Sequence, residues 1–586
     1  MMDYLRFRYR RAARRLRRRL YIWRRASTTY WNRHIWGKWY HLHVVRRFLL
    51  IWAGIVIVAA IALTLQISAL ENKGRAPAPL PGGAYSEAAL GSVQVVNPLL
   101  PDSASSDVNR LIFSGLTRHD AQGRLTADLA TKWDVSTDGK TYTFHLRKNV
   151  KWHDGVPFSA IDVAFTIAAI QNPDSRSPLA SSWQGVKVET KGDYTVIFTI
   201  PTPLASFVNS TTIGIVPRHI LESVEPTQLR EADFNQNPVG TGPFKMKSFA
   251  PAANEITLIA NPRYYFGKPR LDEFTFRYYP TSAEALLAYE RREVVSPGRI
   301  EPAQQRESAG DATLAFYDFN LPEQTTLFFQ TSDTTLNDAG LRKILSQAID
   351  REALLNKAEG GEGRVVTQPL LPGQLGYTAK YALSSLSRDE ARKALDAAGW
   401  KADPKTGLRQ NGAKKLQFKL ATLKGSELEA AARALQSQWE GIGVKLSVIA
   451  VNQDELQQTY MRPRNFQMLL YGVNLGADPD IYAYWHSTQA KDPGVNLSGY
   501  ASADGDKALE AGRISSDARV RAGKYDSFLK AWNNDVPAAV LYQTVYRYGA
   551  AKNVRGITAQ RLVTPADRFF DVQKWTVREK LVPRYR

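Results

Sequence analysis

"LATKWDVSTDGKTYTFHLRKNVKWHDGVPFSAIDVAFT" spans residues 129–166 and holds the clearest structural signals in the chain. Apolar and polar residues alternate in TYTFHLR (141–147), which predicts a half-buried strand. Helical spacing follows over residues 159–170, where Ser159 and Asp162 are placed like a capping box. The stretch therefore predicts a strand and a capped helix joined by a short turn.

The same alternation recurs on both sides of this stretch, in residues 193–200, 254–260 and 538–550. Strands with one apolar and one polar face are typical of half-buried antiparallel sheets. The first half of the body and its C-terminal end are therefore predicted to be rich in antiparallel strands.

The middle of the chain changes character, because two helices are predicted there and each is followed by a strand. Both helices begin with a serine three residues before a glutamate, which is the spacing of a capping box. Helix followed by strand, twice, indicates an α/β unit. These elements, with their capping pairs, are residues 387–400 (Ser387, Glu390), 415–421, 426–443 (Ser426, Glu429) and 443–451.

The body from Gly83 onward has 504 residues, enough on length alone for three or four domains. Its order is a strand-rich region, about two hundred residues of α/β character, and a short strand-rich return. Such an order predicts an inserted lobe with two chain crossings. A body of this kind can open and close about its hinge.

The region before the body has the features of a membrane anchor. Phe48 to Leu70 is 23 residues without a charge, long enough as a helix to cross a hydrocarbon core of about 30 Å. Residues 1–47 carry fifteen Lys and Arg against one acid, which predicts a cytoplasmic N-terminus and an extracytoplasmic body. An uncleaved anchor is favoured over a signal peptide, whose apolar stretch is usually ~7–15 residues. Residues 71–84 are expected to form a semi-extended linker.

The basic tail is predicted to bind anionic lipid at the cytoplasmic surface rather than a specific nucleic acid. The rest of the chain carries only +7 of the formal +21, so no general surface for polyanions is implied. Cysteine is absent, so the chain has no disulfide and no thiol for lipid attachment. The apolar helix is the one tether that the sequence predicts.

Two short motifs call for a structural explanation. In PVGTGPF (238–244), Gly240 and Gly242 suit close approaches that larger residues forbid, and the pattern lacks the remaining residues of a phosphate loop. His153 is expected to be a solvated or turn histidine rather than a metal ligand, because no His/Asp/Glu cluster surrounds it. Trp152 and Phe158 are expected to pack together.

VGTGPFKM (239–246) and LIANPRYYFGKPRLDEFTFRYYP (258–280) follow one another along the chain. These segments resemble the extracytoplasmic solute-binding proteins of peptide and nickel ABC transporters. The resemblance covers nearly all of residues 85–575, in the order of that family. It includes the stretch 129–166 and continues through LRKILSQAIDREALL (341–355), DEARKALDAAGW (389–400) and LSGYASADGDKALEAG (497–512).

The resemblance implies an α/β, two-lobed periplasmic-binding-protein fold of the type II, large peptide-binding class, preceded by a single transmembrane helix. Lobe one would comprise residues 85–322 and 537–586, with a peripheral subdomain at about 126–236. Lobe two would comprise residues 323–536. A solute would be enclosed between the two lobes.

The resemblance also points to a ligand site in LLYGVNLGADPDIYAYWHSTQA (469–490). In peptide-binding members, a carboxylate in the corresponding segment pairs with the α-amino group of the peptide. Asp478 and Asp480 are the candidates here, although Asp478 is also placed to cap a helix with Pro479 at its first position. The other candidate ligand-binding residues are Tyr471, Asn474, Tyr482 and Trp485, with ordinary core packing as the alternative for the three aromatic side chains.

The function implied is capture without chemistry. A membrane-anchored monomer without a cofactor would take up a peptide or similar small solute and deliver it to an ABC permease. A surface-anchored sensor or scaffold that keeps the fold without transport is the alternative. Catalysis is not expected, because GxSxG, HExxH and Cys are absent and the eight histidines are scattered. Nickel chelates, haem and oligosaccharide-like solutes stay open as ligands.

Overall fold

The computed structural model describes residues 21–26, 42–73, 75–308 and 310–583. Most of the basic tail, and with it the predicted contact with anionic lipid, lies outside these ranges. The chain divides into two units, Met1–Ala78 with Lys580–Arg586, and Pro79–Glu579.

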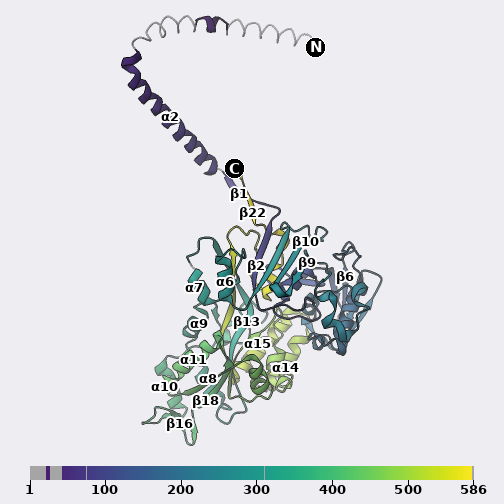
Figure 1. Cartoon of the computed structure of the whole chain (residues 1–586). Coiled ribbons are helices and arrows are strands. Elements are labelled where there is room, and N and C mark those ends of the chain that lie inside the picture. The colour runs from purple at the N-terminus through teal and green to yellow at the C-terminus, as the bar shows by residue number, and fades with distance from the viewer. Residues whose placement is uncertain (1–20, 27–41, 74, 309, 584–586) are drawn as a thin grey trace. The chain divides into compact units, whose positions relative to one another are not determined.

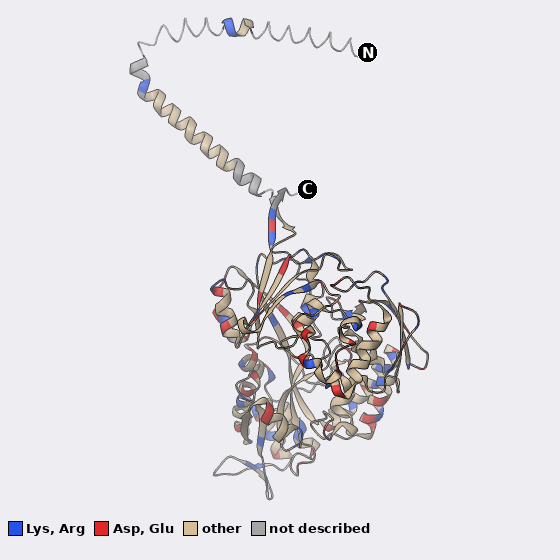
Figure 2. Cartoon of the chain, turned by 45° about the vertical axis from the view of Figure 1, so that its right-hand side comes forward, with Lys and Arg blue, Asp and Glu red and all other residues tan. Residues whose placement is uncertain are grey.

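The first unit contains α2 (Leu42–Lys73), in which Phe48–Gln66 is long and apolar enough to cross a membrane. Figure 2 shows this part of α2 without a charged residue. The prediction of a helix is confirmed. The predicted linker is partly wrong, since α2 continues to Lys73 and is followed by β1 (Arg75–Leu80), which pairs with β22 (Arg578–Pro583).

The second unit begins with two four-stranded sheets from the first half of the body, ordered β2-β11-β10-β9 and β5-β6-β8-β7. All pairs except β2 with β11 are antiparallel, which confirms the prediction for this region. The helix α4 (Ala160–Gln171) has the predicted capping box of Ser159 and Asp162. The strands are β2 (Ala84–Leu90), β5 (Ala130–Val135), β6 (Thr141–Leu146), β7 (Lys187–Thr190), β8 (Thr195–Thr199), β9 (Phe244–Ala250), β10 (Glu255–Ala260) and β11 (Glu273–Tyr279).

A larger sheet follows, ordered β12-β21-β13-β20-β18-β19. Its strands β18 and β19 are parallel and connected by α11, so the predicted α/β unit is confirmed. The sheet and the main helices near it are β12 (Gly298–Arg299), β13 (Leu314–Phe329), β18 (Gln417–Leu423), β19 (Lys445–Val451), β20 (Met468–Asn474), β21 (Ala538–Ala551), α8 (Ala339–Gln347), α9 (Arg351–Glu359), α10 (Arg388–Ala397), α11 (Glu427–Glu440), α13 (Tyr482–Trp485), α14 (Ala503–Ile514) and α15 (Ala518–Asp535).

One of the two helix caps in this region differs from the prediction. The helix α10 has the expected capping box of Ser387 and Glu390. At α11 the capping box is wrong, because the Ser426 hydroxyl donates to the Leu423 carbonyl at 2.9 Å instead. The Glu429 carboxylate accepts from the backbone N–H of Gly425 at 2.8 Å.

The strands β13 and β21 run through both predicted lobes. The early residues of β13, 314–320, pair with 545–551 of β21, and the later residues, 324–328, pair with 538–543. The pairing shifts register between Asn320 and Gln324. In Figure 1, β2, β9 and β10 lie at one end of this unit, α10, β16 (Arg409–Asn411) and β18 lie at the other, and β13 runs between them. The irregular part of β13 lies between Asn320 and Gln324, opposite Val545 and Gln543 of β21.

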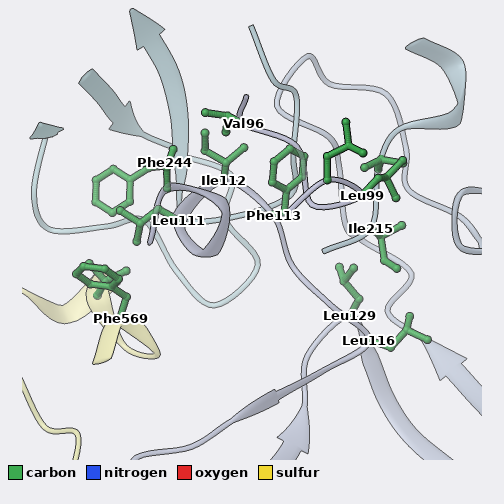
Figure 3. Close-up of a cluster of buried hydrophobic side chains, with 14 of the residues drawn as sticks. Val96, Leu99, Leu111, Ile112, Phe113, Leu116, Leu129, Ile215, Phe244 and Phe569 are labelled. Carbon is green, nitrogen blue, oxygen red and sulfur yellow. The ribbon is translucent and has the colours of Figure 1, made fainter. Parts of the chain in front are cut away.

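The C-terminal return is packed into the core of lobe one. Phe569 is buried in the same hydrophobic cluster as Leu111 and Phe244, and Figure 3 shows these side chains close to one another. The neighbouring Arg568 is 1% exposed, and its guanidinium donates to Glu87 at 2.6 Å and to Asp107 at 2.8 Å. Glu87 and Asp107 precede Arg568 by more than 450 residues. The C-terminal return therefore completes the core of lobe one.

Gly240 and His153 explain the PVGTGPF motif. A Cβ atom on Gly240 would lie 1.9 Å from the Ile112 carbonyl oxygen, so the close approach is confirmed. The ring of His153 accepts from the Gly240 N–H through Nδ1 at 3.2 Å and donates to the Gly242 carbonyl through Nε2 at 3.1 Å. His153 is therefore neutral and buried at a turn, which is the turn alternative of the prediction, and only the solvated alternative is wrong. Trp152 packs edge to face on Phe158, as predicted.

We predict that stability falls in acid because of His153. Burial lowers its pKa from 6.5 to about 4, and Lys245 and Arg263 add to this, while the hydrogen bond with the Gly242 carbonyl and the charge of Asp154 oppose it. The folded state binds the proton less readily than the unfolded state, so the contribution is complete above pH 6.5 and is lost as the pH falls toward 4. It amounts to at most about 3 kcal/mol.

The measurement is the melting temperature between pH 7 and pH 4. His153→Gln keeps a donor and an acceptor but cannot titrate, so its melting temperature should depend less on pH. The control is His145→Gln, which removes an exposed histidine bonded to Asp134 and should alter the pH dependence much less. Equal curves for the wild type and His153→Gln would contradict the prediction.

Candidate ligand site between the lobes

A cavity of about 370 Å³ lies between the two predicted lobes. Its volume is within the range of about 300–1,000 Å³ that is typical of small-ligand sites. The lining of lobe one comprises Gln122, Gly123, Arg124, Leu125, Trp133, Ala205, Val208, Asn209, Pro322, Arg561, Leu562 and Val563. The lining of lobe two comprises Gly373, Gln374, Leu375, Gly476, Ala477, Asp478, Pro479 and Arg521.

Asp478, the first predicted ligand carboxylate, lines this cavity and is already paired. It follows β20, and both of its oxygens accept from Arg521 on α15, with Nη1 to Oδ2 at 2.9 Å and Nη2 to Oδ1. The side chains of Asp478 and Arg521 are only 16% and 8% exposed. Burial alone would lower the pKa of Arg521, but the bonds with Asp478 raise it. The two charges therefore compensate one another in this structure.

Asp480 joins the lobes directly. Its Oδ2 accepts from Arg513 on α14, from Nε at 3.2 Å and from Nη2 at 3.1 Å. The same oxygen accepts from the hydroxyl of Ser206 at 3.2 Å. Ser206 belongs to the 3-10 helix η4 (Ala205–Thr212), which falls in the predicted peripheral subdomain of lobe one. This hydrogen bond therefore crosses from one lobe to the other.

The helix after this segment starts later than expected. The helix α13 has Ile481 as its N-cap residue, and no side chain caps it. The Asp478 carboxylate accepts from Arg521 and not from a backbone N–H of this helix. The prediction of Asp478 as N-cap is therefore wrong. Asp480 accepts from the N–H of Tyr482 at 3.4 Å, a long contact at the first residue of α13.

The remaining four candidates lie outside the cavity lining. Trp485 is 0% exposed and packs between Phe328 and Trp532, with ring centroids 5.8 and 5.7 Å apart, so it is a core residue and its prediction as a ligand contact is wrong in this conformation. Tyr482 stacks on His486 at 4.1 Å, with Arg513 on its ring.

Tyr471 and Asn474 have partners within lobe two. The hydroxyl of Tyr471 accepts from Gln453 at 3.2 Å. The amide of Asn474 donates to Glu323 at 2.9 Å and accepts from the N–H of Gly476 at 2.8 Å. Of the six predicted residues, Asp478 alone reaches the lining of the cavity.

The sequence reasoning missed the part of the site that comes from lobe one. Trp133 lies at the fourth position of β5, and Gln122, Gly123 and Arg124 lie in the turn between β3 (Thr117–His119) and β4 (Leu125–Ala127). Arg561 comes from the C-terminal return. These residues are far apart in the sequence, and no local pattern separates them from ordinary turn and strand residues.

A protein-family comparison identifies this two-lobed arrangement. Residues 124–496 match the family model described as "Bacterial extracellular solute-binding proteins, family 5 Middle". The matched region includes the cavity residues of both lobes except Gln122, Gly123, Arg521 of α15, and Arg561, Leu562 and Val563 of the return. The chain belongs to family 5 of the bacterial extracellular solute-binding proteins. The predicted two-lobed α/β fold is thereby confirmed.

Known members of family 5 cover almost the whole chain. The oligopeptide-binding protein AppA of Bacillus subtilis is 28% identical over 551 residues, which is 90% of this chain and 99% of AppA. The structure of AppA with a nonapeptide has a TM-score of 0.69 and 27% identity, and covers 85% of this chain and 99% of AppA. The structure of NikZ from Campylobacter jejuni with Ni(L-His) has a TM-score of 0.70 and 26% identity, and covers 84% and 99% of the two chains.

We predict that Asp478→Ala destabilises this family 5 protein. Breaking a buried ion pair typically costs about 3–5 kcal/mol, and the partial exposure of this pair reduces that cost. Replacing both partners, as in Asp478→Leu with Arg521→Met, should restore at least half of the lost melting temperature, since no charge is then left unpaired. Thermal unfolding of the full chain measures both.

Asp134→Ala is the control for this pair. It removes an exposed carboxylate 3.8 Å from Lys132 and should change the melting temperature little. If Asp478→Ala kept the wild-type melting temperature and lost solute binding, Asp478 would be a ligand residue instead.

Proposed function

We propose that this protein captures a peptide or similar small solute between its lobes and delivers it to an ABC permease. The observation that carries the proposal is the cavity of about 370 Å³ whose lining is divided between the lobes. Relatives with names such as "Putative ABC transporter peptide-binding protein" in Brucella, 26% identical over 444 residues, support the choice of ligand class and partner. The proposed role is that of a receptor and not of an enzyme.

Closure about the shared strands is the proposed mechanism. A ligand that contacts both lobes binds the closed form more tightly than the open form and so shifts the population toward closure. The hydrogen bond from Ser206 to Asp480 belongs to the closed form, since it joins the lobes. The break in β13 between Asn320 and Gln324 gives the strands a place to bend.

The apolar part of α2 is proposed to act as an uncleaved anchor, with the N-terminus in the cytoplasm and the body outside. The family is extracellular by description, and α2 has the length and composition of a single span. Tethering confines the receptor to a thin layer and raises its effective concentration near a membrane-embedded permease. The receptor is proposed to work as a monomer without a cofactor.

Native mass spectrometry of the full chain in nanodiscs, followed by extraction of bound solutes, tests the proposed ligand class. We expect mixed short peptides. The matched control is Ala477→Trp, which fills the cavity from lobe two and should release them. Recovery of a single sugar or a metal chelate from the wild type would overturn the peptide assignment.

We further predict that Ser206→Ala shifts the lobes toward opening. The variant loses one hydrogen bond across the lobes, worth about 1 kcal/mol, while Asp480 keeps Arg513 as its partner. The ratio of closed to open molecules should fall about fivefold. Single-molecule energy transfer can report this ratio, because the chain has no cysteine and dyes can be attached at Lys187→Cys and Lys507→Cys.

Ser527→Ala is the control for this measurement, since its hydroxyl donates to Gly523 within α15. It should leave the distribution of distances unchanged. An unchanged distribution in Ser206→Ala would show that the hydrogen bond contributes nothing to closure.

A further inference from the structure

Arg561 is held at the hinge by its main chain. Its N–H donates to the Ala121 carbonyl at 3.1 Å. It also forms a bridge with Asn320, the residue of β13 at which the register breaks, and the next residue, Leu562, donates to the Asn320 carbonyl at 3.4 Å. The backbone of Arg561 is therefore held next to Ala121, in the turn between β3 and β4, and next to the register break of β13.

The side chain of Arg561 passes between two glycines of opposite lobes. A Cβ atom built on Gly123 of lobe one would lie 3.5 Å from Cγ and 3.7 Å from Cδ of Arg561. A Cβ atom built on Gly373 of lobe two would lie 3.3 Å from Nη1. Both glycines have positive φ, at +71° and +87°, so a larger residue would be strained there as well. The guanidinium thus lies in the cavity between the lobes.

No ion pair or side-chain hydrogen bond of Arg561 occurs within residues 21–26, 42–73, 75–308 and 310–583. The other two arginines of the lining differ in this respect. Arg521 is paired with Asp478, and Arg124 is paired with Asp120 at 2.8 Å. Burial lowers the pKa of Arg561, and no nearby carboxylate compensates for that burial. The described lining therefore carries one uncompensated positive charge and no uncompensated negative one.

We propose that Arg561 receives an anionic group of the solute, foremost a carboxylate such as a peptide C-terminus, and that the solute needs no free ammonium group. This inference rests on the proposed function and specifies its ligand class. A guanidinium presents a planar fork of donors that fits a carboxylate with two parallel hydrogen bonds. The two carboxylates of the 469–490 segment are occupied by arginines, so an ammonium group would have to displace one of them.

The proposal separates peptides by which end is blocked. A C-terminal amide removes the anion and leaves the half-buried Arg561 covered by the peptide without a partner, so binding should weaken by about 30-fold or more. An N-terminal acetyl group removes only the ammonium group and should change binding less than threefold. A site that relied on Asp478 for the α-amino group would show the opposite order.

The test uses the full chain in nanodiscs and a tripeptide pool randomised at all three positions, in free, C-terminally amidated and N-terminally acetylated forms. Native mass spectrometry reports the bound fraction. Arg561→Gln should lose the preference for free over amidated peptides, and Arg561→Lys should keep part of it. Arg555→Gln is the matched control, because Arg555 pairs with Glu579 outside the cavity and should behave as the wild type.

Stability distinguishes recognition from a structural role. Arg561→Gln removes a half-buried cation without a protein partner, so its melting temperature should equal or exceed that of the wild type. A lower melting temperature would assign Arg561 to the fold. Equal retention of free and amidated pools, or loss of the acetylated pool alone, would overturn the proposal.

If the wild type binds none of the three pools, the proposed function fails for short peptides. A second measurement then tests whether Arg561 binds an anion. The melting temperature is then measured with a panel of carboxylates and phosphate monoesters at constant ionic strength. Stabilisation of the wild type that Arg561→Gln removes would support an anion site with another solute. The same response in both proteins, or none in either, would overturn it.

Discussion

The pairing of β13 with β21 is the constraint on which both lobes depend. Both strands belong to the large sheet along their whole length, with one end of each in lobe one and the other end in lobe two, so the lobes share a hydrogen-bonded ribbon. About two hundred residues separate the two strands in the sequence, and closing so long a loop has an entropic cost that grows slowly with its length. An inserted lobe with its own hydrophobic cluster is compatible with that cost, because most of its contacts are internal.

Charge compensation is the second organising feature of the cleft. A carboxylate removed from water is stable only with a partner, and the helices α14 and α15 supply arginines to Asp480 and Asp478 in turn. The same rule explains the closed end of lobe one, where Arg568 is shared by Glu87 and Asp107. Asp478 and Asp480 are thus each paired with an arginine in this structure, which leaves Arg561 as the unpaired charge of the described lining.

Features that depend on near neighbours in the sequence could be predicted, and features that depend on distant partners could not. Alternation and the capping box at Ser159 need only residues within one turn or strand, and they are confirmed. At Ser426 the spacing predicted a capping box that does not form, because the Glu429 carboxylate accepts from the Gly425 N–H and from Arg433 instead. The roles of Asp478 and Asp480 depend on arginines 43 and 33 residues away, for which the sequence has no signal.

The position of Arg561 links solute recognition to lobe movement. Its main chain is bonded beside the register break of β13, and its guanidinium lies next to Gly373 of the other lobe. Separation of the lobes would return the guanidinium to water, where an anion gains little because both charges are well hydrated. Closure excludes water and leaves the cation without a protein partner, so an anion gains most in the closed form. A ligand shifts a conformational equilibrium only if it binds one conformation more tightly than the other. The unpaired guanidinium of Arg561 gives an anionic ligand a higher affinity for the closed form than for the open form.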